Sequence, residues 1–167
     1  MRILLIVGIL SAALASGCSP SEASQNNTPP LQEGASTMEV ASRFMQAMGQ
    51  GDMETMASLM DDLMVWHNEG DKAMPWIGPW KGKDEILETF FPLFGENFQT
   101  TKWETEDALA QGDVAVFFGK MKGITTKSGE ETGEFTFALR VKVKDGKIVL
   151  WNWLEDSYEV SQKYHAQ

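Results

Sequence analysis

Apolar residues between positions 36 and 63 recur every three or four positions, which is the spacing of one face of an α-helix. Ser36 and Glu39 fit a capping box at the start of a first helix, and Gly51 follows its end. Asp52 can cap a second helix that runs to Leu63. We interpret the methionines of both helices as core packing. The predicted apolar faces hold Val40, Phe44, Met45, Met48, Met53, Met56, Leu59, Met60 and Leu63.

The next segment mixes a strand, a loop and a third helix. A short strand is predicted over 64–68, and the proline- and tryptophan-containing residues 69–82 are predicted to form a loop. Asp84 and Glu85 open a helix that is disrupted near Pro92.

After residue 97 the apolar pattern changes to a period of two, which is typical of strands. The predicted strands are 98–106, 114–122, 134–143 and 147–154, with turns at Gly112-Asp113, Ser128-Gly129 and Asp145-Gly146. A short C-terminal helix is predicted near Ser157. Helices followed by consecutive antiparallel strands predict an α+β fold, with the helices packed on one face of a curved sheet.

The first 18 residues have the features of an export signal. Arg2 precedes the apolar run Ile3–Ala15, which is shorter than the about 20 residues that a membrane-spanning helix needs. The stretch Leu14-Ala15-Ser16-Gly17-Cys18 resembles the lipobox of bacterial lipoproteins, whose cysteine is diacylated and becomes the mature N-terminus. An ordinary signal peptide that leaves a free thiol is the alternative. We expect a signal peptide at 1–17, the lipidated Cys18 with a flexible tether at 18–36, and one domain at 37–167.

The composition fits an exported protein held at a membrane by its lipid. Cys18 is the only cysteine, so the domain has neither a disulfide nor a cysteine-based metal site. The formal net charge is −10, and removal of residues 1–17, which contain Arg2, changes it to −11. So acidic a domain repels nucleic acid and anionic headgroups. By the same lipoprotein resemblance, Ser19 implies the outer membrane, facing the periplasm, if the host has one. We expect no cofactor, and the two widely separated histidines favour no metal site.

Several segments together are similar to the SnoaL-like branch of the NTF2-like superfamily, which includes ketosteroid isomerase, limonene epoxide hydrolase and polyketide cyclases. They are Gly51-Asp52 through Trp66-His67-Asn68, the stretch from Pro75 to Glu85, and Asp145-Gly146-Lys147-Ile148 through Glu155-Asp156. The resemblance covers nearly all of 37–160 and implies a cone-shaped α+β fold. In that fold the N-terminal helices and the curved sheet enclose a pocket.

The last predicted hairpin carries the most chemical information. If Asp145-Gly146 is a two-residue turn without a bulge, Arg140 pairs with Trp151. One face of the hairpin then holds Arg140, Trp151, Trp153 and Glu155. Large aromatic side chains with a few polar groups are typical of a ligand pocket, and the resemblance places the family's cavity on this face.

The other face of this hairpin is then almost purely apolar. It would hold Phe135, Phe137, Leu139, Val141, Ile148, Leu150 and Leu154. An exposed apolar face of this kind indicates a partner subunit, so we expect a homodimer. A bulge in the hairpin would exchange the two faces.

The strand 64–68 supplies further candidate site residues. The resemblance places Trp66 and Asn68 in the cavity, with His67 pointing the other way. His67 is a structural residue or, if the strand twists, a general base. Arg140 and Glu155 either hold a polar group of the ligand or form an ion pair at the rim.

The acid–base residues of the related enzymes are replaced in this chain. Asn68 stands where the isomerases have an aspartate base, and an amide cannot accept that proton. Trp153 stands where epoxide hydrolases and cyclases have an aspartate, two positions after the residue that matches Trp151. The hydrolases also use an Arg-x-Asp pair on a middle strand, which residues 118–122 lack.

Three functions remain open at this point. The first is the binding of a small, largely apolar molecule in a tryptophan-lined pocket. The second is an isomerase, hydrolase or cyclase-type enzyme with a non-standard set, in which His67 or Glu155 is the base and Arg140 or Asn68 orients the substrate. The third is an association domain whose cavity is packed shut and whose apolar face binds another envelope protein. A pocket carboxylate or imidazole with a strongly perturbed pKa would favour the enzyme.

Overall fold

The computed structural model describes residues 35–166. The predicted signal peptide, Cys18 and tether up to residue 34 lie outside the described residues. The described residues belong to one compact unit, and its core of buried apolar side chains extends from Val40 to Tyr164. This unit therefore has a hydrophobic core of its own, and we expect it to fold without the first 30 residues.

Two helices open the domain, as the periodicity predicted. Helix α1 spans Thr37–Gln50, and Ser36 and Glu39 form the predicted capping box at its start. Gly51 ends α1 in the left-handed conformation, with φ of 68°. Helix α2 spans Met53–Leu59, and the Asp52 side chain accepts a hydrogen bond from the Thr55 amide.

The predicted extension of the second helix to Leu63 is wrong. Strand β1 begins at Met60 and runs to Asn68, so the Leu63 side chain is 83% exposed. Met60 and Met64 are both buried. Their spacing of four residues is a multiple of two as well as one helical turn, so it fits both a helix and a strand.

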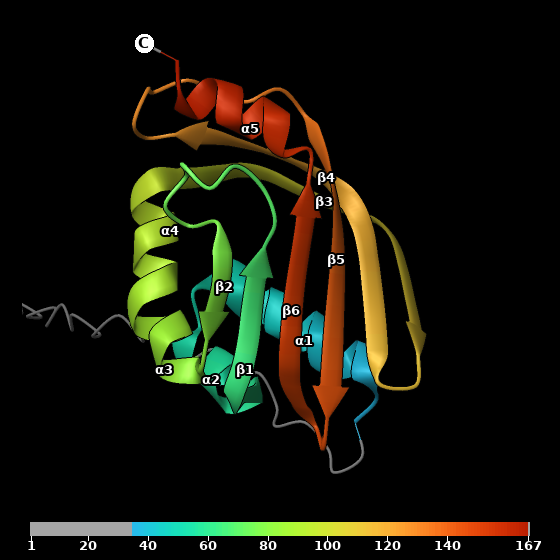
Figure 1. Ribbon diagram of the computed structural model, residues 1–167. Helices are drawn as coiled ribbons and strands as arrows, with labels where there is room; N and C mark the ends of the chain where they lie inside the picture. Colours follow the sequence, from blue (N-terminus) through green and yellow to red (C-terminus); the bar gives the residue numbers. More distant parts are fainter. Residues whose placement is uncertain (1–34, 167) are drawn as a thin grey trace, which may run out of the picture. The chain divides into compact units, whose positions relative to one another are not determined.

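Six strands form one sheet in the order β2-β1-β6-β5-β4-β3 (Figure 1). The other strands are β2 (Gly78–Lys81), β3 (Phe98–Gln111), β4 (Val114–Thr125), β5 (Phe135–Lys144) and β6 (Lys147–Glu155). The strands from β3 to β6 form the predicted antiparallel meander. Strand β1 joins this meander parallel to β6, which makes the sheet mixed. Strand β2 lies in the segment predicted to be a loop and pairs with β1.

Helices cover one face of this curved sheet, and α1 lies behind the strands in Figure 1. The third predicted helix consists of α3 (Lys83–Glu85), the π-helical turn η1 (Ile86–Phe90) and α4 (Phe91–Asn97). The regular α-helical hydrogen bonding is interrupted close to Pro92, as predicted, because the π-helical turn η1 ends two residues before this proline. Helix α5 spans Ser157–Tyr164, close to its predicted start.

A β-bulge shifts the register of the β5–β6 hairpin. The pairs Lys144–Lys147 and Val143–Ile148 follow the predicted two-residue turn, but the next pair is Lys142–Leu150. Val149 is therefore an extra residue on β6, and every later side chain of this strand moves to the other face. The predicted register without a bulge is wrong.

The bulge exchanges the two predicted faces of β5. Arg140 pairs with Asn152 on the outer face of the sheet, whereas Trp151 and Trp153 pair with Val141 and Leu139 on the inner face. The predicted apolar face for a partner subunit therefore does not exist as such. The following members of it are buried inside the domain: Phe135, Phe137, Leu139, Val141 and Ile148.

Candidate functional site

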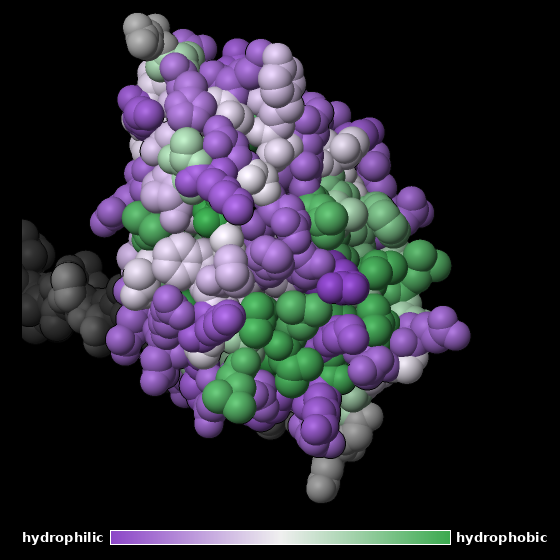
Figure 2. All heavy atoms as spheres, in the orientation of Figure 1, coloured by the Kyte–Doolittle hydropathy of each residue, from purple (hydrophilic) through white to green (hydrophobic). Residues whose placement is uncertain are grey.

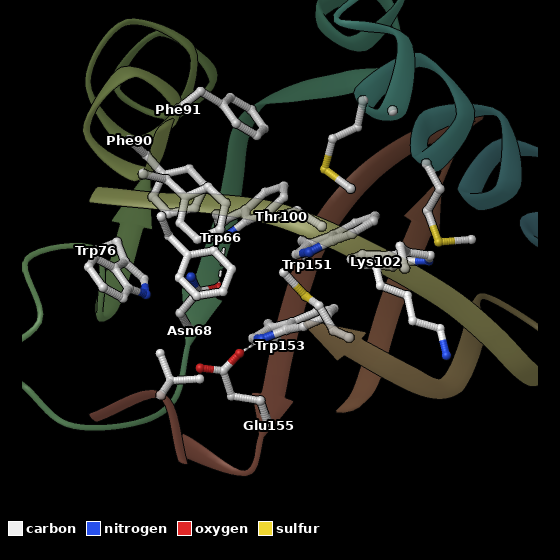
Figure 3. A pocket seen from close by; sticks show the side chains of 18 of the residues that line it. Trp66, Asn68, Trp76, Phe90, Phe91, Thr100, Lys102, Trp151, Trp153 and Glu155 are labelled. Carbon is white, nitrogen blue, oxygen red and sulfur yellow. Dashed lines mark hydrogen bonds between the residues drawn. The ribbon is translucent and has the colours of Figure 1, made fainter. Parts of the chain in front are cut away.

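A cavity of about 600 Å³ lies between the inner face of the sheet and the helices (Figure 3). Strands β1, β3 and β6 and helices α1 and α4 contribute side chains to its wall, and most of these are aromatic or methionine side chains. A cavity of this size can hold a drug-sized molecule.

Stacked rings form the sheet side of the cavity. Trp66 and Trp151 stack with ring centroids 4.8 Å apart and an interplanar angle of 16°. Trp153 stacks on Phe137 at 4.6 Å and 21°. These tryptophans face the cavity because they occupy alternate positions on β1 and β6. Phe90 of η1 lies 4.9 Å from Trp66 and continues the aromatic surface onto the helical side.

Few polar groups face this aromatic surface. The Trp66 indole N–H donates to Oδ1 of Asn68 at 2.9 Å. The Trp153 indole N–H donates to Oε2 of Glu155 at 2.6 Å. Figure 3 shows Glu155 next to Trp153, with Asn68 nearby on the neighbouring strand. Nε1 of Trp151 is buried and has no hydrogen-bond partner among the described residues.

The environment of Glu155 favours its neutral form. Burial raises the pKa of Glu155 to about 7, the hydrogen bond from Trp153 opposes this rise, and the negative charge of Asp156 adds to it. Near pH 7 the carboxyl group is therefore close to half-protonated. A group in this state can accept or donate a proton at neutral pH.

Five of the seven predicted pocket residues line the cavity. They are Trp66, Asn68, Trp151, Trp153 and Glu155. Their alternation on two neighbouring strands brings them together, and their roles in binding or catalysis stay predictions.

The other two residues lie outside the cavity: the placement predicted for Arg140 is wrong, whereas His67 points away from the cavity, as predicted. Arg140 is exposed on the outer face of the sheet and cannot pair with Glu155 inside the cavity. His67 also points outward, and its Nδ1 lies 3.4 Å from Oε1 of Glu69. The pairing of β1 with β2 and β6 is regular from Val65 to Asn68, so no bulge there turns the imidazole inward. His67 therefore cannot act as a base in this cavity.

Part of the cavity wall was not predicted. Phe90, Phe91 and Phe94 line it from the helical side, and Thr100 and Lys102 line it from β3. The apolar pattern of 86–94 indicated a buried helix face, but periodicity alone does not distinguish packed core from cavity wall. The Lys102 ammonium bonds to the carboxylates of Glu104 and Glu134, at 2.9 and 2.8 Å.

Among residues 35–166, no three histidine, cysteine, aspartate or glutamate side chains lie close enough to hold a metal ion. Within the same residues, no helix is long and apolar enough to cross a membrane.

Comparisons with known proteins agree with this architecture. The family model of the SnoaL-like domain matches residues 41–151. An NTF2-like protein from Burkholderia xenovorans has a similar structure, with a TM-score of 0.70 and 17% identity over 77% of this chain and 95% of that one. A protein from Mesorhizobium loti described as a candidate SnoaL-like polyketide cyclase has a TM-score of 0.59 and 20% identity over 72% and 99%.

A third solved structure is a candidate isomerase from Rhodopseudomonas palustris, with a TM-score of 0.64 and 15% identity over 78% of this chain and 96% of that one. At these identities the solved structures show a shared fold and nothing more about function. No curated protein sequence matches the chain.

Proposed function

This chain belongs to the SnoaL-like domain family, and we propose that it is an exported, lipid-anchored domain that binds a small, largely apolar molecule in its tryptophan-lined cavity. The observation that carries the proposal is the aromatic cavity of about 600 Å³. A domain that used its core for stability alone would fill this space, because protein interiors are close-packed. The open cavity also argues against an association domain whose pocket is packed shut.

The test is equilibrium dialysis of residues 31–167 against naphthalene derivatives, which match the flat, apolar wall. We expect saturable binding at one site per domain and quenching of tryptophan fluorescence. Met48→Trp is the control, because Met48 lines the cavity from α1 and a larger ring there occupies part of the space. Equal binding to the wild type and to Met48→Trp would place the ligand elsewhere and contradict the proposal.

A specific observation favours a second function, acid–base catalysis by Glu155. A carboxyl group with a pKa of about 7 in an apolar cavity suits proton transfer at neutral pH. An isomerase or cyclase-type reaction that begins with removal of a proton next to a carbonyl group would use it as the base. The candidate isomerase and candidate cyclase among the structural neighbours are compatible with this reaction class.

Proton transfer can be tested without knowing the substrate. In D₂O, a base in the cavity takes a proton from the methyl group of 2-acetylnaphthalene, and the carbanion then takes a deuteron from solvent. We expect the domain to accelerate this exchange, followed by proton NMR, and Glu155→Gln to abolish the acceleration. If the probe binds but its methyl protons exchange no faster than in buffer alone, a role for Glu155 as a base is contradicted.

We also propose that the domain forms a homodimer through the outer face of the sheet. This face carries Val116, Phe118, Ala138, Leu150 and Leu154 around the outward-pointing Arg140 and Asn152. Phe118 and Leu154 are each 43% exposed, and Figure 2 shows apolar side chains gathered over parts of this face. Light scattering tests the proposal: we expect a dimer that Leu154→Glu converts to a monomer, and a monomeric wild type would contradict it.

Export and anchoring rest on the sequence of residues 1–18 alone. We expect Cys18 to incorporate radiolabelled palmitate and to hold the chain in the membrane fraction. Cys18→Ser should lose the label and release the protein. If the wild-type protein incorporates no palmitate and still fractionates with membranes, lipidation of Cys18 is contradicted. Nucleic acid is not an expected partner, because the net charge is −10.

A further inference from the structure

Three tryptophans on the strands share one local pattern, in which the indole N–H bonds to the side chain two residues further along. Trp66 donates to Asn68 at 2.9 Å, Trp103 to Thr105 at 3.2 Å and Trp153 to Glu155 at 2.6 Å. Residues two apart on a strand point to the same face. A polar side chain at the second position therefore satisfies the indole of the first.

Two strand tryptophans depart from this pattern. The Trp80 N–H of β2 donates instead to the Trp76 carbonyl oxygen at 3.3 Å, whereas Trp151 finds no acceptor. The residue two positions further is Trp153, whose indole has a donor and no acceptor. Nε1 of Trp151 is accordingly buried without a hydrogen-bond partner among the described residues, although the side chain lines the cavity. A buried N–H without a partner costs free energy and is rare in proteins, so each instance requires an explanation.

We propose that Trp151 Nε1 is the hydrogen-bond donor that anchors the ligand, and that the ligand presents an uncharged acceptor oxygen to it. This inference rests on the proposed binding function and adds the polar chemistry of the site. The ligand oxygen would accept the Trp151 N–H, as the side chain two residues further along accepts the N–H of Trp66, Trp103 and Trp153. Because an indole N–H can only donate, the ligand atom must be an acceptor.

The charges around the cavity exclude an anionic ligand oxygen. Glu155 becomes negative in the same cavity above neutral pH, and the Lys102 ammonium already bonds to Glu104 and Glu134. A buried ligand anion would therefore lack a cation to pair with. Carbonyl, ether and amide oxygens are neutral acceptors and meet the requirement.

The position of Trp151 also orients the ligand. Trp151 packs between Phe44 and Trp66, with ring centroids 5.1 and 4.8 Å away. Glu155 lies four residues further on β6, which is about 13 Å along a strand. A ligand that lies over Trp153 thus has its acceptor oxygen at the Trp151 end and its other end near Glu155. In this orientation the protons next to the carbonyl group of 2-acetylnaphthalene lie far from Glu155, so anchoring by Trp151 and proton removal by Glu155 require opposite orientations of this probe. Because Nε1 is itself buried, the side chains around it must shift slightly when the oxygen enters.

Two probes of matched shape test this inference: 2-acetylnaphthalene, which has one carbonyl oxygen, and 2-ethylnaphthalene, which has none. The domain 31–167 carries six tryptophans, so a ¹H–¹⁵N spectrum shows six indole signals. We expect the ketone to move the Trp151 N–H signal downfield and the hydrocarbon to leave it without a downfield shift.

Affinities supply an independent measurement. Trp151→Phe keeps an aromatic ring and removes the donor. Relative to the wild type, the preference for the ketone over the hydrocarbon should fall by roughly three- to tenfold in this variant, as for the loss of one neutral hydrogen bond. If Trp151→Phe fails to fold, the wild-type spectrum decides, because contacts with the Phe44 and Trp66 rings assign the Trp151 signal.

The possible failures are distinguishable. If both probes bind and neither moves the Trp151 signal downfield, or if Trp151→Phe keeps the full preference for the ketone, the anchoring role is wrong and the binding function stands. If neither probe binds, both the inference and the proposed binding function are overturned.

Discussion

Glu155→Gln should make the domain more stable at alkaline pH and leave its stability at pH 4.5 nearly unchanged. Glutamine has almost the same shape as glutamate, and its amide oxygen can still accept the Trp153 N–H. It cannot ionise. The substitution therefore isolates the free energy of placing a negative charge at this position.

The magnitude follows from the pKa of Glu155, which is about 7 in the fold against 4.5 ordinarily. At about 1.4 kcal/mol per pH unit, this difference corresponds to roughly 3 kcal/mol, and solvent screening of a half-buried group lowers it to roughly 2–3 kcal/mol. Because the pKa is raised, the folded state binds more protons than the unfolded state between pH 4.5 and 7. The free energy of unfolding of the wild type should fall as pH rises through this window and level off above it.

Urea denaturation of residues 31–167 at pH 4.5, 6, 7 and 8 measures this effect. The difference between Glu155→Gln and the wild type should grow from near zero at pH 4.5 to roughly 2–3 kcal/mol at pH 8. The control is Glu88→Gln, because Glu88 is an exposed carboxylate; this variant should follow the wild-type curve. A constant difference across the whole pH range would mean that Glu155 does not titrate in this window.

Four further substitutions test the placement of side chains, the packing of the sheet and the cap of α1. His67→Ala and Arg140→Ala should leave the affinity for naphthalene probes within about twofold of the wild type, since both side chains point away from the cavity. A larger loss of affinity in equilibrium dialysis would mean that these side chains contact the ligand. Gly119→Ala should destabilise the domain by more than about 2 kcal/mol in urea, because the added methyl group would lie 2.0 Å from the Glu104 carbonyl oxygen. Ser36→Ala should cost about 1 kcal/mol through loss of the α1 capping box, and an unchanged thermal midpoint would count against that cap.

The sequence predicted the fold class because its local signals agree with the tertiary structure. The capping box, the glycine turns and the change of period from 3.6 to 2 each reflect backbone preferences that act within a few residues. The same local signals missed β2 because its four residues, Gly78–Lys81, include Pro79 and show no alternation. Strand β2 exists because it pairs with β1, which is a tertiary effect.

Which side chains line the candidate site depends on one extra residue in β6, Val149, whose position the sequence pattern does not predict. The turn at Asp145-Gly146 was predicted correctly, and both residues have the positive φ that a type I′ turn needs, 50° and 73°. The bulge at Val149 is not visible in the pattern, because both possible registers place several apolar residues on each face. Because of the bulge, Phe137, Leu139 and Val141 of β5 lie on the inner face of the sheet, and Arg140 lies on the outer face. The cavity is therefore more apolar than the unbulged register predicts.

The most direct measurement is native mass spectrometry of residues 31–167, exported by the host and purified without organic extraction. If the cavity binds a small, largely apolar molecule, part of the protein should carry one additional small mass, and Met48→Trp should lose it. Release of the molecule would also identify the natural ligand. A wild-type domain that shows no added mass, even after incubation with an extract of the cell envelope, would contradict the proposal that this cavity is a binding site.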